Sequence, residues 1–552
     1  MSGLRFSRLI SDGAILQRNK EIHVWGFAEK GAKIKVVLAP EKDNPEDLGE
    51  EADSTVSDEG RFDVFFDKRD AGGPYVITAS DDNNKEKITA HDVYVGDVYF
   101  ISGQSNMEFP MIRVKDTYPE EWEGFGDSFI RTFKIVEKGV FEGPIEDVET
   151  GEWLSFNSDT IDNYSAVGYF MAKTLRQKED VPVGLLNISL GGAPLEAFLS
   201  REMLEGFDNA IAEADKYKNE KYRNEVLHLN DLNANRWHDN IDATDLGLQQ
   251  SWEDGKKILD EGTKFMIPEF FSDTELGGFV GSVWFARTFD VPKEFAKKKA
   301  MVWFGTITDY DFCYVNGKLI GSTPYCYPPR RYEIPEGLLK EGPNTIVFRV
   351  CVEKGYGRIT PGKLFGVIFG TGKRVTDGFN EKFVGADHII ELSGVWKYLK
   401  GCGIGATREI DPAEDTVFVN WKPTALFNGM VAPVTSFPVK AICFYQGESN
   451  CQRASEYQLL TKRHIEGYRK LWNDESLPYI CVQLPRFNAR IEECSYDGGK
   501  SWRELQNAQE KVTEIPGAYM VKAYEYGESN DLHPQRKEPI GRMLAEVILN
   551  EC

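Results

Sequence analysis

Four short segments of this sequence carry residue types that together suit acyl transfer. That chemistry needs a hydroxyl nucleophile, a base, an acid to orient the base, and neutral donors for the oxyanion. Ser105 supplies a hydroxyl, His533 a base with Asp531 two residues before it, and the pair Gly191-Gly192 supplies backbone amides. The four segments read FISGQSNME (100–108), NISLGGAPLE (187–196), FYQGESN (444–450) and SNDLHP (529–534).

Each segment taken alone also has a plain structural interpretation. Ser105 suits the cap of a following helix, Gly191-Gly192 suits a tight strand-to-helix turn, and a lone histidine is usually incidental. The polar cluster 444–450 is costly to bury without partners, so a polar cleft explains it better than a core. The sequence around Ser105 is not G-x-S-x-G, which argues against an α/β-hydrolase elbow.

The elements around these segments predict a parallel α/β sheet. Three of the four segments begin at or directly follow an apolar run with the character of a buried strand, and helical spacing occurs between the runs. Functional groups in such sheets gather outside the carboxyl ends of the strands. The expected strands are 93–101, 183–189, 441–445 and 479–484, and the expected helices are 166–177, 455–471 and 539–549.

Two further regions have an all-β texture. Short alternating strands predict a small β-sandwich over residues 1–92, and a second β region with an Asn316-Gly317 hairpin turn covers 265–400. The α/β pattern occupies 93–264 and resumes over 401–552. We therefore expect one α/β domain, split by an inserted β-domain and preceded by another.

Composition excludes several classes of function. The 552 residues include 88 acidic and 65 basic side chains, and a formal charge of -23 disfavours nucleic-acid and anionic-lipid binding. No apolar run of eighteen residues occurs, and the N-terminus has no signal-peptide pattern, so we expect a cytoplasmic protein. The nine cysteines, all between residues 313 and 552, show no metal-ligand spacing and are expected to be reduced thiols.

Five motifs in order carry a family resemblance. GQSNME, NISLGGAPLEAF, PTALFNGMVAP, FYQGESN and NDLHP resemble the sialate O-acetylesterase group of SGNH-type carbohydrate esterases over most of the chain. The insert, through SVWFARTFDVP, YVNGKLIG and EGLLKEGPNTIVFRV, is similar to the β-galactosidase-type jelly-roll domain found inside such esterases. The resemblance implies a flavodoxin-like α/β/α catalytic domain and deacetylation of acetylated sugars without a metal or organic cofactor.

The resemblance also implies roles for individual residues. Ser105 becomes the nucleophile and His533 the base. The backbone amides of Ser105 and Gly192, with Gly191 as the alternative, become oxyanion donors. The third donor is a side-chain amide, for which we favour Gln446 and keep Asn450 as the alternative. The residues expected to contact substrate are Gln104, Asn106, Glu448 and Asn450.

The acid of the triad departs from the family pattern. Many SGNH enzymes place an aspartate three residues before the histidine, where this sequence has Asn530. Asp531 is the available carboxylate, and in an extended loop positions i and i+2 lie on the same side. Glu525, Glu528 or a simple Ser–His dyad are the alternatives.

The substrate stays open between two classes. An anionic sialic acid needs a local arginine patch, for which Arg113, Arg201 and Arg331 are candidates. Neutral acetylated xylo-, manno- or xyloglucan-oligosaccharides suit the acidic chain slightly better.

Two other interpretations compete with an esterase. Trp303, Tyr325 and Tyr327 suit stacking on sugars, although such aromatics more often belong to the core. A non-catalytic carbohydrate-binding protein on an esterase scaffold is the alternative function. A peptidase is a weaker one.

Overall fold

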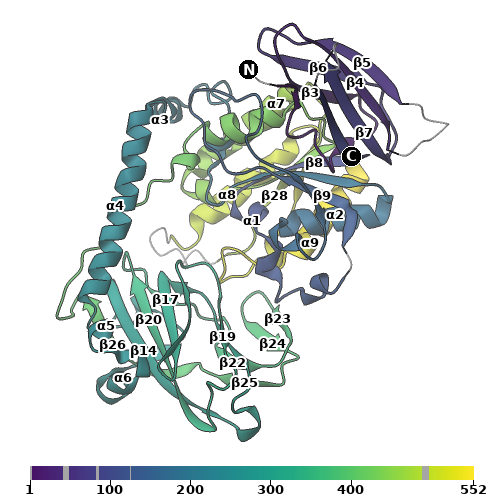
Figure 1. Ribbon diagram of the computed structural model, residues 1–552. Helices are drawn as coiled ribbons and strands as arrows, with labels where there is room; N and C mark the ends of the chain where they lie inside the picture. Colours follow the sequence, from purple (N-terminus) through teal and green to yellow (C-terminus); the bar gives the residue numbers. More distant parts are fainter. Residues whose placement is uncertain (1–2, 42–48, 82–85, 125, 488–496) are drawn as a thin grey trace.

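A central, mainly parallel sheet forms the middle of the molecule (Figure 1). The computed structural model describes residues 3–41, 49–81, 86–124, 126–487 and 497–552. The sheet order is β10-β9-β11-β8-β27-β28-β29, and only β10 runs antiparallel to its neighbour. These strands are β8 (Lys87–Gly103), β9 (Asp127–Lys134), β10 (Trp153–Phe156), β11 (Val183–Ser189), β27 (Ala441–Tyr445), β28 (Tyr479–Val482) and β29 (Ala518–Val521).

Helices cover both faces of this sheet (Figure 1). Successive residues of a strand point to opposite faces, and Phe100 and Ile101 of β8 show which helix lies on which side. The Phe100 ring packs edge-on against Tyr468 and Trp472 at the end of α7, whereas Ile101 lies against Gly168 of α2. The covering helices are α2 (Ala166–Glu179) with α9 (Lys537–Glu551), and α7 (Ala454–Leu471) with α8 (Lys500–Glu510).

The N-terminal region is all β, as the alternating pattern predicts. One sheet has the order β1-β3-β6, and a second is formed by β5, β4, β7 and the first half of β8. Strand β8 therefore crosses the expected boundary between residues 92 and 93 and continues into the central sheet. The region contains β1 (Arg5–Phe6), β2 (Ile15–Gln17), β3 (Ile22–Phe27), β4 (Lys33–Pro40), β5 (Glu50–Thr55), β6 (Arg61–Phe66) and β7 (Gly72–Asp81).

The inserted region is a set of antiparallel sheets with its own apolar core. Its largest sheet has the order β12-β26-β14-β20-β17-β18, and a second has the order β19-β15-β22-β25. The predicted Asn316-Gly317 turn joins β17 to β18, and both residues have positive φ, as a two-residue hairpin turn requires. The strands are β12 (Thr263–Ile267), β13 (Glu269–Phe270), β14 (Gly281–Val291), β15 (Ala300–Phe304), β16 (Ile307–Thr308), β17 (Tyr310–Val315), β18 (Lys318–Thr323), β19 (Arg330–Ile334), β20 (Gly342–Val352), β21 (Arg358–Ile359), β22 (Gly366–Phe369), β23 (Lys373–Thr376), β24 (Glu381–Val384), β25 (His388–Glu391) and β26 (Gly394–Gly403).

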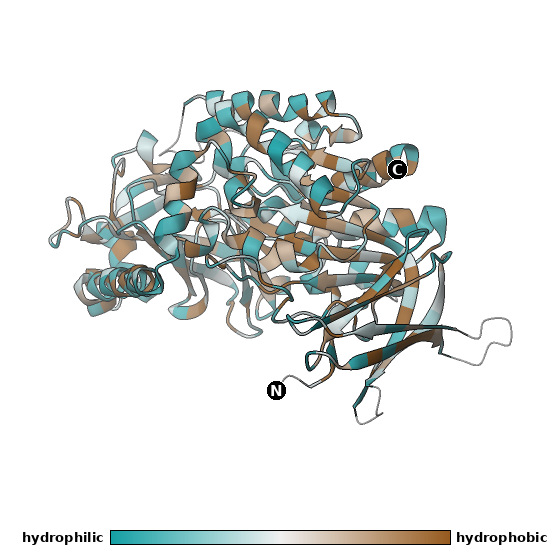
Figure 2. Ribbon diagram, turned by 90° about the horizontal axis from the view of Figure 1, so that it is seen from above, coloured by the Kyte–Doolittle hydropathy of each residue, from teal (hydrophilic) through white to brown (hydrophobic). Residues whose placement is uncertain are grey.

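A helical stretch that the sequence analysis did not anticipate leads into the inserted region. It consists of α3 (Asp208–Tyr217), α4 (Glu220–Thr244), α5 (Leu246–Gln249) and α6 (Lys256–Glu261). Helix α4 lies at the left of Figure 1 and is mostly hydrophilic in Figure 2, where it is seen end-on. Asp245, which caps α5, accepts hydrogen bonds from Trp284 and pairs with Arg349, so the stretch is anchored to the inserted strands.

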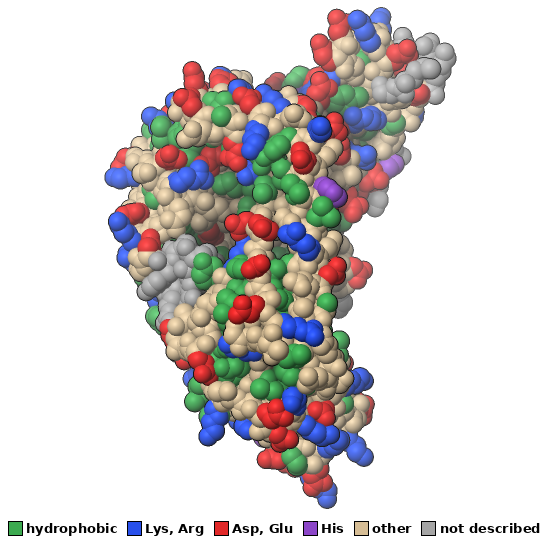
Figure 3. Space-filling model, turned by 90° about the vertical axis from the view of Figure 1, so that its left-hand side faces the viewer, with side chains coloured by type: hydrophobic (Ala, Val, Ile, Leu, Met, Phe, Trp, Pro, Cys, Tyr) green, Lys and Arg blue, Asp and Glu red, His purple; other side chains and the backbone are tan. Residues whose placement is uncertain are grey.

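One apolar core joins the N-terminal region to the central sheet, whereas the inserted region has a separate core. The shared core contains Trp25 and Val36 of the N-terminal strands together with Phe100 and Ile442 of the central sheet. On the face that Figure 3 shows, acidic and basic side chains are interspersed. No helix in the described ranges is long and apolar enough to cross a membrane.

Candidate active site

Ser105 and His533 lie side by side although 428 residues separate them in the sequence. The Nε2 atom of His533 is 2.8 Å from the Oγ atom of Ser105, which is hydrogen-bond distance. Ser105 begins the short helix α1 (Ser105–Glu108) directly after β8, and His533 lies on the loop between β29 and α9. The arrangement matches a nucleophile with its general base.

Glycine at the end of β8 permits this placement. Gly103 has a φ of +137°, and a Cβ atom at this position would lie 2.0 Å from the carbonyl oxygen of Tyr445 at the end of β27. The two strand ends can therefore approach closely only with glycine at residue 103. Ser105 and the segment after β27 consequently project from neighbouring strand ends.

The ring of His533 lies between two aromatic side chains. Phe109 stacks on it at a centroid distance of 5.8 Å, and Tyr327 of the inserted region meets it edge-on at 4.8 Å. Burial lowers the pKa of His533 to about 3, and the positive charges of Lys537 and Arg113 act in the same direction. The imidazole is therefore neutral at neutral pH and able to accept a proton.

This environment predicts an unusual acid limb in the pH profile. A histidine base works only above its pKa, and the pKa of His533 lies below the ordinary value of about 6.5. We expect kcat/KM on p-nitrophenyl acetate to stay level from about pH 8 to pH 6 and to reach half its maximum only below about pH 5.5. The measurement is the rate of p-nitrophenyl acetate hydrolysis at each pH in this range. A midpoint of the acid limb at or above pH 6.5 would contradict the prediction.

Asp531 touches the backbone of His533 rather than its ring. One carboxylate oxygen accepts the His533 backbone N–H at 2.9 Å, and the other lies 2.8 Å from the Nζ atom of Lys363. Within the described ranges, no carboxylate accepts a hydrogen bond from the His533 ring. The expectation that Asp531 orients the imidazole directly is therefore not met, because both of its oxygens are directed elsewhere.

The alternative acids are also directed away from the ring. Glu528 is buried, pairs with Arg374 and accepts the backbone N–H of Gln535 at 2.9 Å. Glu525 is exposed. Asn530, at the position where the family pattern has aspartate, donates to the carbonyl of Pro361 in the inserted region. The Ser105–His533 pair is thus a dyad in this structure.

The two candidate glycines differ in whether the backbone N–H already donates a hydrogen bond. The N–H of Gly191 donates to Glu108 at 2.7 Å. For the N–H of Gly192 we find no acceptor in the described part of the chain, and both Gly192 and Ser105 line the same cavity. A Cβ atom at Gly192 would lie 2.0 Å from Trp421, and its φ is +75°, so glycine is needed there. Of the pair, Gly192 has the amide that is available to an oxyanion.

The two side-chain amides after β27 do not reach the cavity. The nitrogen of Gln446 lies 2.7 Å from the Oδ1 atom of Asn450 and within hydrogen-bond distance of Gln104 and Ala193. The nitrogen of Asn450 donates to Glu196 at 2.9 Å, and both residues are 0% exposed. The expectation that one of them faces the oxyanion is not met in this arrangement, since their donors already bind buried acceptors.

The four residues expected to contact substrate divide into two groups, and Asn450, which is fully buried, belongs with those that do not line the cavity. Gln104 and Glu448 line the cavity. Asn106 does not, and instead binds Glu448, the carbonyl of Leu532 and the Lys537 ammonium. Asn106 therefore ties the turn that carries Ser105 to the loop that carries His533. Burial raises the pKa of Glu448, one oxygen of which has no hydrogen-bond partner among the described residues.

The dyad opens into a cavity of about 660 Å³ whose walls include seven Phe, Tyr and Trp side chains. Tyr325 and Tyr327 come from the inserted region, which therefore contributes to the cavity, and Trp303 is instead buried in that region. The remaining aromatic wall residues are Phe109, Phe418, Trp421, Phe487 and Trp502. This size and character suit a small organic ligand or a sugar unit.

The three candidate arginines do not form a patch. Arg113 lines the cavity and donates to the hydroxyl of Tyr325, whereas Arg201 pairs with Asp215 and Arg331 pairs with Asp116. Lys134, which the sequence analysis did not single out, also lines the cavity and lies 3.6 Å from Glu108. Among the described residues, no cluster of His, Cys, Asp and Glu is arranged to hold a metal ion. The free thiols include those of Cys313, Cys351, Cys402, Cys443, Cys451, Cys481 and Cys552, and Cys494 lies outside the described residues.

Comparison with known proteins finds similarity to carbohydrate esterases. Residues 415–550 match the family model described as carbohydrate esterase, sialic acid-specific acetylesterase. The resemblance to sialate O-acetylesterases is confirmed. The rat sialate O-acetylesterase is 28% identical over 214 residues, 37% of this chain and 39% of that protein. The human sialate O-acetylesterase is 27% identical over 214 residues, 37% of this chain and 40% of that protein.

A solved structure is similar over nearly the whole chain. A carbohydrate acetylesterase from Xanthomonas citri covers 99% of this chain, and the match includes 75% of that protein, with a TM-score of 0.55 and 19% identity. At this identity the likeness is one of fold, a mixed α/β architecture with a parallel sheet and several antiparallel sheets. The sequence match to the sialate O-acetylesterases spans about two fifths of their length.

Proposed function

We propose that this protein is a serine-dependent carbohydrate O-acetylesterase that needs no metal or organic cofactor. The observation that carries the proposal is the 2.8 Å contact between Ser105 Oγ and His533 Nε2 at the wall of a cavity about 660 Å³ in volume. The match of residues 415–550 to the acetylesterase family supports the acetyl ester as the group that is cleaved.

The topology supports a finer description of the fold. The order β11-β8-β27-β28-β29 corresponds to 2-1-3-4-5, the order of flavodoxin-like sheets, with β9 and β10 added beyond β11. Ligands of such sheets bind where the strand order reverses, which is here between β8 and β27. We assign residues 93–264 and 401–552 to this SGNH-type domain, 1–92 to a β-sandwich and 265–400 to a jelly-roll.

Acylation would use the dyad and the free amide. Ser105 Oγ attacks the acetyl carbonyl carbon while His533 Nε2 takes the hydroxyl proton, and the carbonyl π bond becomes an oxyanion. The N–H groups of Ser105 and Gly192 donate to that oxyanion. The intermediate then collapses, the bond to the sugar oxygen breaks, and His533 returns its proton to that oxygen.

Deacylation would repeat the steps with water. His533 removes a proton from water as the water oxygen attacks the acetyl-Ser105 carbonyl. Collapse of this second intermediate breaks the bond to Ser105 Oγ, which takes the proton back. Acetate and the free enzyme are the products. Because no carboxylate among the described residues accepts a hydrogen bond from the His533 ring, the imidazolium depends on the amides and cavity groups around it for stabilisation.

An oligosaccharide suits the site better than a single sugar. A second cavity of about 1010 Å³ adjoins the first and shares Gly192, Phe418, Trp421 and Ser449 with it. The rings of Phe418 and Trp421 stack at 3.9 Å, and Phe418 is 48% exposed. An exposed aromatic face between two cavities suits stacking on a sugar ring.

Phe418→Ala should separate binding of a long substrate from chemistry. We expect KM for an acetylated oligosaccharide to rise about tenfold, because the loss of one aromatic contact weakens binding by roughly that factor. The value of kcat/KM for p-nitrophenyl acetate should change less than about twofold. Phe65→Ala, which removes a similarly exposed ring on β6, is the control. An equal loss on both esters would contradict the stacking role.

The experiment that tests the proposed function is mass spectrometry of acetylated sugars before and after incubation. One arm uses O-acetylated sialic acids, for which Arg113 and Lys134 offer positive charge at the cavity wall. The other uses acetylated xylo-, manno- and xyloglucan-oligosaccharides. Loss of acetyl mass in either arm supports the proposal and names the substrate class. Binding without acetate release in both arms would instead support the non-catalytic carbohydrate-binding alternative.

A further inference from the structure

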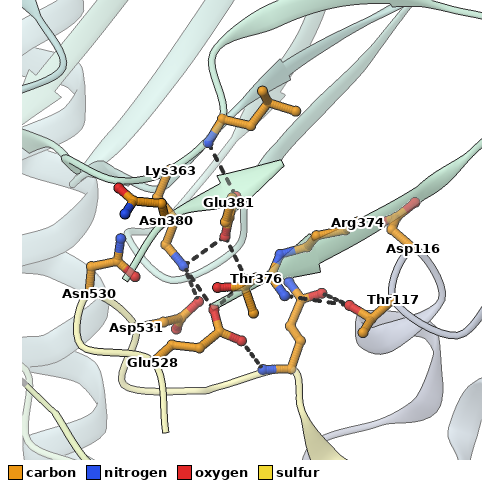
Figure 4. A network of polar contacts seen from close by, with 12 residues as sticks. Asp116, Thr117, Lys363, Arg374, Thr376, Asn380, Glu381, Glu528, Asn530 and Asp531 are labelled. Atoms are coloured by element: carbon orange, nitrogen blue, oxygen red, sulfur yellow. Dashed lines mark hydrogen bonds and ion pairs between the residues drawn. The ribbon is translucent and has the colours of Figure 1, made fainter. Parts of the chain in front are cut away.

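A cluster of buried charges joins the inserted region to the loop that carries His533 (Figure 4). Lys363 lies 2.9 Å from Glu381 and 2.8 Å from Asp531, and Arg374 pairs with both Glu381 and Glu528. The side chains of all five residues are at most 6% exposed. Three of them belong to the inserted region, Lys363 between β21 and β22, Arg374 on β23 and Glu381 on β24, and two belong to the His533 loop.

Two carboxylates of this cluster each hold a backbone amide in the His533 loop. Asp531 accepts the N–H of His533 at 2.9 Å, and Glu528 accepts the N–H of Gln535 at 2.9 Å. The His533 backbone is thereby held at its own amide and again two residues later. Each carboxylate is in turn fixed by a cation of the inserted region, Asp531 by Lys363 and Glu528 by Arg374.

Backbone contacts strengthen the same junction. The N–H of Ser529 donates to the carbonyl of Gly378, and the side chain of Asn530 donates to the carbonyls of Pro361 and Phe379. The α/β domain contributes less to this loop, through Asn106 on the carbonyl of Leu532 and Thr117 on the side chain of Gln535. The inserted region thus contacts four successive residues of the His533 loop, from Glu528 to Asp531.

We propose that Lys363 is a positioning residue for His533, acting through Asp531. The ammonium of Lys363 fixes one oxygen of Asp531, so that the other holds the backbone amide that sets where the imidazole meets Ser105. This inference rests on the proposed function, since it concerns the alignment of the same dyad. It gives the inserted region a role in the geometry of catalysis as well as in the walls of the cavity.

The test is a double-mutant cycle with Lys363→Met and Asp531→Asn on the full chain. Misplacing a catalytic group by about 1 Å can cost about 10²-fold in rate. We therefore expect Lys363→Met to lower kcat on p-nitrophenyl acetate about 10²-fold with little change in KM. In the Asp531→Asn background, the further loss caused by Lys363→Met should be less than about threefold, because the two residues act in series.

The pH profile supplies a readout that a purely structural loss would not move. Arg113 of η1 (Met111–Val114) and Lys537 of α9 act electrostatically on His533, and Glu448 of η11 (Glu448–Arg453) lines the same cavity; all three are unchanged in these variants. Lys363→Met alone leaves the negative charge of Asp531 unbalanced. The acid limb of kcat should therefore move to higher pH in Lys363→Met and return toward wild type in the double variant.

Arg349→Met is the matched control. Arg349 is 2% exposed, pairs with the buried Asp245, and holds strands of the inserted region to α5 without touching the His533 loop. Its folded fraction should keep wild-type kcat and the wild-type pH profile. Additive losses in the cycle, or an unchanged kcat in folded Lys363→Met, would overturn the proposal.

The cycle also separates this inference from the proposed function. If wild-type protein cleaves acetyl esters and Lys363→Met does so equally well, only the positioning role fails. If Lys363→Met does not fold, the double variant with Lys363→Met and Asp531→Asn, in which both charges are removed, is compared with Asp531→Asn alone. A difference in kcat above about tenfold between those two folded variants would overturn the role of Lys363 through Asp531.

Discussion

Ser105→Ala is expected to lower kcat on p-nitrophenyl acetate by about 10⁴-fold or more, equivalent to about 5.4 kcal/mol of barrier. Without Oγ no acetyl-enzyme forms, and only the amides and the cavity remain to assist attack by water. The methyl group of alanine fits the site because it is smaller than the serine side chain, and among the described residues the side-chain hydrogen bond that is lost is the one with His533. Burst kinetics and intact-protein mass spectrometry should show acetyl-enzyme in the wild type only.

Ser102→Ala is the matched control for this loss. Ser102 lies three residues earlier on β8, is fully buried, and donates to the carbonyl of Ile188 at 2.6 Å. Its loss should cost about 1 kcal/mol of folding free energy and leave kcat within about twofold. Near wild-type activity in Ser105→Ala would remove Ser105 from the mechanism.

His533→Ala is expected to lower kcat by about 10³- to 10⁴-fold at neutral pH. The variant loses the base for Ser105 and for water, and the acid for the leaving sugar oxygen. It also leaves a gap between Phe109 and Tyr327 of the size of an imidazole ring. Added imidazole should therefore restore part of the activity in a saturable manner, measured as acetate release against imidazole concentration.

His464 offers a control with the same chemistry in a different place. It is fully buried on α7, its Nδ1 atom lies 3.0 Å from the Tyr479 hydroxyl, and burial lowers its pKa to about 3. The folded fraction of His464→Ala should keep its kcat and show no response to imidazole. If His533→Ala behaved in the same way, His533 would not be the base.

Local sequence patterns carried much of the fold. The predicted strand at 183–189 coincides with β11, and the helices expected at 166–177 and 455–471 fall within one or two residues of α2 and α7. These elements are strongly periodic or continuously apolar, and their pattern directly reflects their burial. The helices α3 to α6 were not anticipated, because α4 is polar around most of its surface and has no clear apolar stripe.

The candidate site was predictable to the extent that it follows strand ends. Ser105 follows β8 after one residue and Gly192 follows β11 after two, and their place follows from the parallel order of the sheet. Lys363 could not be found in this way. It lies 168 residues from Asp531 in sequence, within another domain, and no local pattern reports a contact of that kind.

The oxyanion role expected for Gln446 or Asn450 shows a second limit of prediction from sequence. The sequence indicates that polar side chains follow β27, and it does not say which of their donors are already bound. In the structure, the two amides are joined to each other and to Glu196. A shared hydrogen-bond network of this kind is fixed only when separate segments fold together.

The length of β8 bears on how the N-terminal sheet is placed relative to the nucleophile. The strand is hydrogen-bonded to β7 near its start and to both β11 and β27 near its end, and Ser105 follows it after one residue. Residues 87–95 of β8 pair with β7 and residues 97–103 pair with β11, so a single strand connects the N-terminal sheet to the turn that carries Ser105. Asp92, with a φ of +55°, lies at a register shift within that strand, so the orientation of the N-terminal sheet relative to the nucleophile depends on this bend.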